Sequence, residues 1–142
     1  MELPLRLLVS AVVVGVTAPA VVSGLSAVET AQASERAAAA VDALVRAAQD
    51  FYLAGGGAQA IPVDLRGGLT VRVESVTIGD APGGPRAATA AYTLSGQPPA
   101  FLLTDPPVPM AGDEGPLRLG TGHHVVRVSF EGQGPVRLAV VG

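Results

Sequence analysis

The sequence predicts an α+β protein in which a long N-terminal helix packs on a small antiparallel β-sheet or sandwich. Three observations indicate this class. Residues 7–28 contain no charged side chain, and residues 29–54 are rich in helix-forming residues with apolar positions at helical spacing. From residue 60 onward the apolar period changes to two, which is typical of strands.

Length and composition limit the possible functions. A chain of 142 residues accommodates one domain and an appendage. The net charge of −3 is thinly spread and aromatic residues make up only 4%, so we expect no nucleic-acid partner. The absence of cysteine excludes disulfides, thiolate metal sites and cysteine nucleophiles.

The uncharged run over residues 7–28 is long enough to cross a bilayer. At about 1.5 Å per residue, a helix of this length spans roughly 30 Å, the thickness of the hydrocarbon core. We therefore expect a membrane span with lipid as a partner, in which small residues permit close helix–helix contact. The candidate membrane and helix-assembly residues are Leu7, Leu8, Val12, Gly15, Pro19 and Gly24.

Flanking charges predict how this span is oriented. Arg6 precedes the run, while Glu29 and Glu35 follow it, so the N-terminus is expected in the cytoplasm and the β domain outside the cell. A cleaved signal peptide is the alternative, because small residues around 17–20 and 31–33 offer cleavage sites.

The second half of the predicted helix, residues 29–54, is amphipathic. One apolar stripe with helical period is expected to pack on the sheet. It consists of Val41, Leu44, Val45, Ala48, Phe51 and Tyr52. Three glycines, residues 55–57, are expected to cap this helix within a hinge over residues 55–59.

The region 60–142 is expected to form a β-rich domain of six or seven short strands. Strands at 60–65 and 67–80 are predicted to form a hairpin around Gly67 and Gly68, and a second hairpin joins 123–131 to 136–141. Further strands are expected over 87–95, 98–105 and 116–120, and residues 105–116, with four prolines, are expected to form a stiff, exposed loop.

No residue pattern indicates catalysis or cofactor binding. His123 and His124 form the only histidine pair, but neighbouring residues in a strand point to opposite faces and cannot easily share a metal. The glycine runs lack a following Lys-Ser or Lys-Thr, so neither is a phosphate loop. We expect no catalytic residue, no cofactor, no metal site and no small-molecule substrate.

The layout of an apolar helix, an amphipathic continuation, a glycine hinge and a β domain resembles that of archaeal type IV pilins. The segments PLRLLVSAVVVGV, RAAQDFYLAGG and LRGGLTVRVESVTIGD are also similar to small single-pass archaeal membrane proteins with an extracellular β domain. This resemblance implies a structural, pilin-like subunit of a cell-surface filament or membrane complex. Its partners would be copies of itself or related subunits, joined through the apolar helix.

One part of the family pattern is missing. Pilin precursors carry a basic residue and a glycine immediately before the apolar run, whereas here the run follows Arg6-Leu7, and Glu2 precedes it. The alternative function is that of a membrane-anchored β domain that binds an envelope component or a partner protein.

Overall fold

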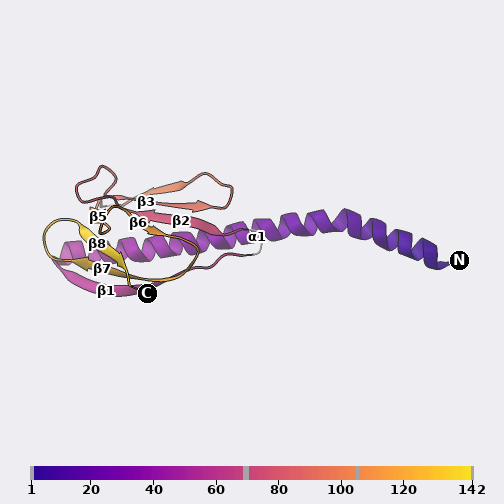
Figure 1. Ribbon diagram of the computed structural model, residues 1–142, viewed down its shortest axis with the longest axis horizontal. Helices are drawn as coiled ribbons and strands as arrows, with labels where there is room; N and C mark the ends of the chain where they lie inside the picture. Colours follow the sequence, from indigo (N-terminus) through magenta and orange to yellow (C-terminus); the bar gives the residue numbers. More distant parts are fainter. Residues whose placement is uncertain (1, 69–70, 105, 142) are drawn as a thin grey trace.

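The computed structural model describes residues 2–68, 71–104 and 106–141, with helix side chains described from Gly24 onward. One helix, α1, is assigned to Glu2–Ala54, and the chain after it forms strands (Figure 1). The strands are β1 (Gly57–Leu65), β2 (Val73–Ile78), β3 (Thr89–Leu94), β4 (Ala100–Leu103), β5 (Met110–Ala111), β6 (Leu117–Leu119), β7 (Gly122–Phe130) and β8 (Val136–Val140).

The strands form two four-stranded sheets. The first has the order β1-β7-β8-β5 and the second the order β4-β3-β2-β6. Neighbouring strands pair antiparallel except β5 and β8, which are parallel. The α+β class is therefore confirmed, and the expected β layer consists of two small sheets.

The C-terminal half of α1 lies between these sheets (Figure 1). It contacts β1, β7 and β8 of the first sheet and β2 and β3 of the second. A single buried cluster joins all three layers, with fully buried members such as Leu44 from α1, Ile78 from the second sheet and Leu138 from the first. The two small sheets do not form the whole core by themselves, and the helix supplies the remaining part.

The glycine run ends α1 as the sequence predicted. Gly55 has a φ of 80°, and the Gly56 N–H donates to the Phe51 carbonyl at 3.0 Å. This six-residue closure with a left-handed glycine is the Schellman arrangement. Strand β1 then begins at Gly57, so the expected hinge over residues 55–59 is shorter than predicted.

The hairpin predicted between 60–65 and 67–80 is wrong, whereas the hairpin between β7 and β8 is confirmed. Strand β1 pairs with β7, and β2 pairs with β3 and β6, so the two predicted partners lie in different sheets. Apolar residues alternate in both strands, but alternation indicates only that one face is buried, not which strand lies alongside.

The proline-rich segment 105–116 is only in part the exposed loop that the sequence predicted, because its centre is buried while Pro106, Pro107, Asp113 and Glu114 are exposed. Val108, Met110 and Ala111 are buried. The Met110 N–H donates to the Ala87 carbonyl, and the Val136 N–H donates to that of Pro109, both at 2.8 Å. The segment thus connects the two sheets, and its deletion would remove part of the core.

The predicted membrane anchor is not supported. In the part of the chain whose side chains the structure describes, from Gly24 onward in α1, no helix combines the length and apolar character that crossing a bilayer requires. The predicted location, a single span with a cytoplasmic N-terminus and an extracellular β domain, is therefore wrong. From Gly24 onward, α1 carries charged side chains such as Glu35, Arg36 and Asp42. Its apolar stripe packs against the two sheets.

Candidate binding groove between helix and sheet

An open, mainly apolar groove runs between α1 and the edge of the second sheet. Its volume is about 560 Å³. We refer to it as the α1–β4 groove, and its lining residues are Glu35, Ala38, Ala39, Val41, Asp42 and Val45 from α1 together with Ala90, Leu102, Leu103 and Thr104. Alanines on the helix side keep the groove open, because larger side chains would fill it.

Strand β4 forms the outer wall of this groove and is an edge strand with uncovered apolar side chains. Phe101, Leu102 and Leu103 are 64%, 42% and 81% exposed. Leu102 lies opposite the buried Ala90 and shares its face, which is turned toward α1. Exposed edges of this kind are usually protected by charges or prolines within the strand. Residues 100–103 contain neither.

The backbone of β4 also offers hydrogen-bonding groups. The Thr104 N–H donates to the Ala88 carbonyl at 3.1 Å, which fixes the alternation along the strand. In an antiparallel pair, every second residue turns its N–H and C=O away from its neighbour. In β4 these are Phe101 and Leu103, whose polar backbone groups lie on the open edge.

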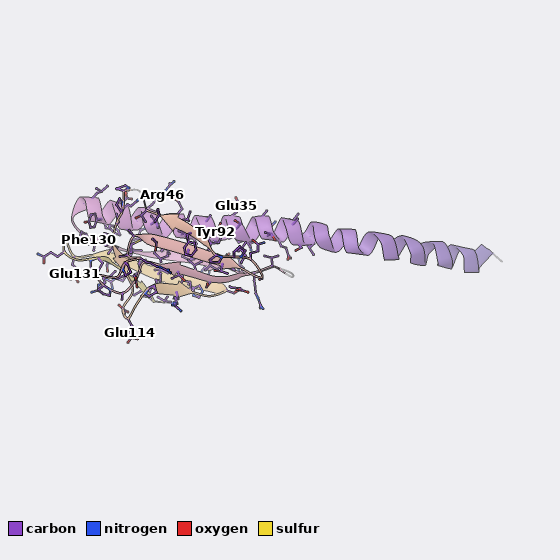
Figure 2. The ribbon with its side chains drawn as sticks, turned by 90° about the horizontal axis from the view of Figure 1, so that it is seen from above. Glu35, Arg46, Tyr92, Glu114, Phe130 and Glu131 are labelled. Carbon is purple, nitrogen blue, oxygen red and sulfur yellow. The ribbon has the colours of Figure 1, made fainter. Side chains whose placement is uncertain are left out.

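The helix side of the groove carries acidic groups. Glu35 and Asp42 both line it. Asp42 pairs with Arg46, one helical turn further on, with 3.0 Å between Oδ2 and Nε. Glu35 forms no ion pair with any of the described residues. Figure 2 labels Glu35 and Arg46 on α1, alongside the sheets.

The predicted helix-to-sheet residues occupy three environments. Val41, Leu44 and Ala48 are buried in the core. Val45 and Phe51 are half-buried against it. Tyr52 is 40% exposed, yet its ring centroid lies 5.2 Å from that of Phe130.

The buried face of α1 is larger than the predicted stripe and extends further toward the N-terminus. Ala33, Ala37, Ala40 and Ala47 are also buried, so the packed face begins two turns before Val41. Their spacing of three, four and seven residues carried the signal, but alanine is weakly hydrophobic and also occurs on exposed helix faces. Tyr92 reinforces this contact, because its hydroxyl lies 3.1 Å from Ser34 Oγ.

Of the predicted helix-assembly residues, only Gly24 has a described environment. A methyl group built on it would meet nothing within 4 Å, so this position is open. Leu7, Leu8, Val12, Gly15 and Pro19 lie outside the residues whose side chains are described.

A polar clamp fastens α1 to the loop between β1 and β2. Glu29 is 8% exposed, and its Oε2 accepts from the Val71 N–H at 3.0 Å. Two turns along the helix, Arg36 Nη1 donates to the Arg66 carbonyl at 2.9 Å. A side chain on Gly68 would collide with the Glu29 carboxylate, so this glycine permits the close approach.

Replacing Glu29 by alanine is expected to destabilise the protein by about 1–3 kcal/mol, because a buried backbone N–H loses its acceptor. Glu29→Gln keeps an acceptor oxygen and should cost less. Hydrogen exchange at the Val71 amide checks the mechanism, with Glu35→Ala as an exposed control. Unchanged exchange at Val71 in Glu29→Ala would contradict the clamp.

Asp64 and Arg66 form a second polar pair at the end of β1. The Arg66 side chain donates to both carboxylate oxygens, at 2.8 and 2.7 Å, and its backbone N–H donates at 3.1 Å. These bonds, with the side-chain ones largest, lower the pKa of Asp64 from 3.8 to about 2.

Because the folded-state pKa of Asp64 is depressed, its pair with Arg66 stabilises the fold above about pH 4, and this contribution is lost as the pH falls toward 2. An NMR titration of the Asp64 carboxyl carbon should show a midpoint near pH 2. In Arg66→Gln the midpoint should move up toward 3.8. An unmoved midpoint would assign the shift to another cause.

The histidine pair is divided as its strand position predicted. His123 is exposed and His124 half-buried, with His124 Nε2 2.9 Å from the Gly120 carbonyl oxygen. Within the described residues, no group of three or more His, Cys, Asp or Glu side chains is placed to hold a metal. The expected absence of enzymatic activity, cofactor and substrate stays a prediction.

Comparison with protein-family models, with curated proteins and with solved structures finds no match for this chain. Evidence about the function of this chain therefore comes from its fold and from the α1–β4 groove.

Proposed function

We propose that this protein is a structural, pilin-like subunit that assembles with copies of itself or with related subunits through the N-terminal part of α1. One observation carries the proposal. The helix leaves the β domain before Glu29, its first buried residue among those described, and the preceding Leu25 and Val28 are 40% and 54% exposed. The sequence leading to this point, residues 7–23, has no charged residue.

The C-terminal part of α1 is covered by the β domain. The part from Ala33 to Ala48 buries its apolar stripe against both sheets. Figure 1 shows the N-terminal end of α1 extending away from the sheets. Association of apolar helices gains about 25 cal/mol for each Å² of apolar surface that it removes from water. Helix packing between subunits would provide this burial.

Electron microscopy and sedimentation of the purified full-length chain test the proposal. We expect filaments or large oligomers, and we expect Val12→Glu to reduce the assembled fraction at least about tenfold, because a buried charge without a partner is costly. Ala31→Glu adds the same charge at an exposed helix position and should leave assembly unchanged. A wild-type chain that sediments as a monomer at all concentrations would refute it.

The α1–β4 groove favours a second candidate function, a binding module for a partner protein. An exposed apolar edge strand with free backbone groups can accept an added strand or an amphipathic helix. Sedimentation discriminates between the two functions. A binding module remains monomeric until its partner is added, whereas a structural subunit assembles alone.

A further inference from the structure

We infer that the α1–β4 groove is the acceptor site for residues 5–23 of a second copy of this chain. The inference rests on the proposed function and identifies the surface that receives the assembling segment. The groove and the segment belong to different parts of the molecule, so each copy offers one of each.

The groove and the segment are both mainly apolar. Leu102, Val41 and Val45 are the larger apolar side chains of the groove, while Ala38 and Ala39 on α1 leave room for a close neighbour. Residues 7–23 consist of apolar and small residues. As a helix, 17 residues measure about 26 Å, and the acceptor face between Glu35 and Val45 measures about 15 Å. The segment is therefore long enough to cover the whole groove.

The charges of the two surfaces are complementary. The groove is lined by two carboxylates, Glu35 and Asp42, and Glu35 has no ion-pair partner among the described residues. The segment carries one charged side chain, Arg6, which is the first basic residue of the chain and precedes the next, Arg36, by 30 positions. We place Arg6 against Glu35 at the end of the groove, with the apolar residues that follow packed between α1 and β4.

This pairing also determines the form of the assembly. An interface between two different surfaces is heterologous: it closes into a ring, or into a dimer by reciprocal exchange, where the rotation allows, and otherwise it produces an open filament. The competing arrangement is a symmetric dimer in which two β4 edges pair with each other. That arrangement would cover the exposed Phe101 and Leu103 but leave the N-terminal segments free.

Disulfide cross-linking in the full-length chain tests the inference, because the natural sequence contains no cysteine. One cysteine is placed in the groove by Leu102→Cys, and the other in the segment by Leu8→Cys, Val12→Cys or Val16→Cys in turn. Under mild oxidation of the assembled protein, at least one pair should give intermolecular dimers and longer ladders. The same segment positions combined with Arg118→Cys, which replaces an exposed side chain on β6, should not.

A charge exchange tests the register independently. Arg6→Glu and Glu35→Arg should each raise the concentration needed for half-assembly about two- to fivefold, the range expected for one exposed ion pair. The double variant, which restores opposite charges, should return to the wild-type concentration. Two single effects that add in the double variant would place Arg6 elsewhere.

The outcomes separate this inference from the proposed function. A wild-type chain that never assembles overturns both. A chain that assembles normally, forms no groove cross-link with any segment position and tolerates Leu102→Asp overturns the acceptor site alone. Cross-linking of Leu102→Cys by itself, without a segment cysteine, identifies the symmetric β4 dimer and also overturns the acceptor site.

Discussion

Replacing Gly79 by alanine is expected to destabilise the protein by about 3 kcal/mol or more. Gly79 has a φ of 74°, which costs a residue with a side chain roughly 1–2 kcal/mol. An added Cβ would also overlap the carbonyl group of Met110, which belongs to β5 and accepts from the Asp80 N–H at 3.1 Å. The substitution would therefore separate β5 from the end of β2, where the two sheets meet.

Gly83→Ala is the matched control for this prediction. Gly83 has a φ of 79°, but a side chain there would meet nothing within 4 Å. Gly83→Ala should therefore lower the free energy of unfolding only by the cost of the backbone conformation, roughly 1 kcal/mol. Urea denaturation of both variants measures the difference. Equal losses would show that the contact between Gly79 and Met110 is unimportant for stability.

Replacing Leu44 by alanine is expected to lower the free energy of unfolding by about 2–5 kcal/mol. Leu44 is fully buried at the centre of the α1 stripe, where the helix contacts both sheets. Truncation leaves a cavity that the close-packed layers on either side can only partly fill. Because α1 completes the core, the loss should appear in the cooperative unfolding of the whole domain.

Leu53→Ala provides the comparison on the same helix. Leu53 is 75% exposed, so its truncation should change stability by less than about 0.5 kcal/mol. Denaturation followed by circular dichroism at a helix-sensitive and a sheet-sensitive wavelength measures the stability change of each variant and shows whether helix and sheets unfold together. If Leu44→Ala melted the helix while the sheets stayed folded, the shared core would be refuted.

Several elements were predictable because they depend on local chemistry. The helix stop at Gly55 follows from the conformational freedom of glycine, and the β7–β8 hairpin follows from two alternating runs joined by a short glycine-containing turn. The burial of Val41, Leu44 and Ala48 follows from helical spacing. Each of these signals lies within a few consecutive turns or residues.

The groove could not have been predicted in the same way. Its walls come from Glu35–Val45 on α1 and Leu102–Thr104 after β3, which lie nearly 60 residues apart. Ala38 and Ala39 look like ordinary helix formers in the sequence, and the exposure of Leu103 contradicts the rule that leucine is buried. Only the placement of β4 at an open edge makes these residues one surface.

The sequence by itself determined the α+β class, the end of the helix and the face that the helix buries, because period and glycine chemistry act locally. Only the tertiary structure decided that β1 and β2 join different sheets, that the segment 105–116 enters the core through Val108 and Met110, and that Glu29 clamps a loop. Those outcomes depend on which distant surfaces meet, and that choice is made by packing and buried hydrogen bonds across the whole chain.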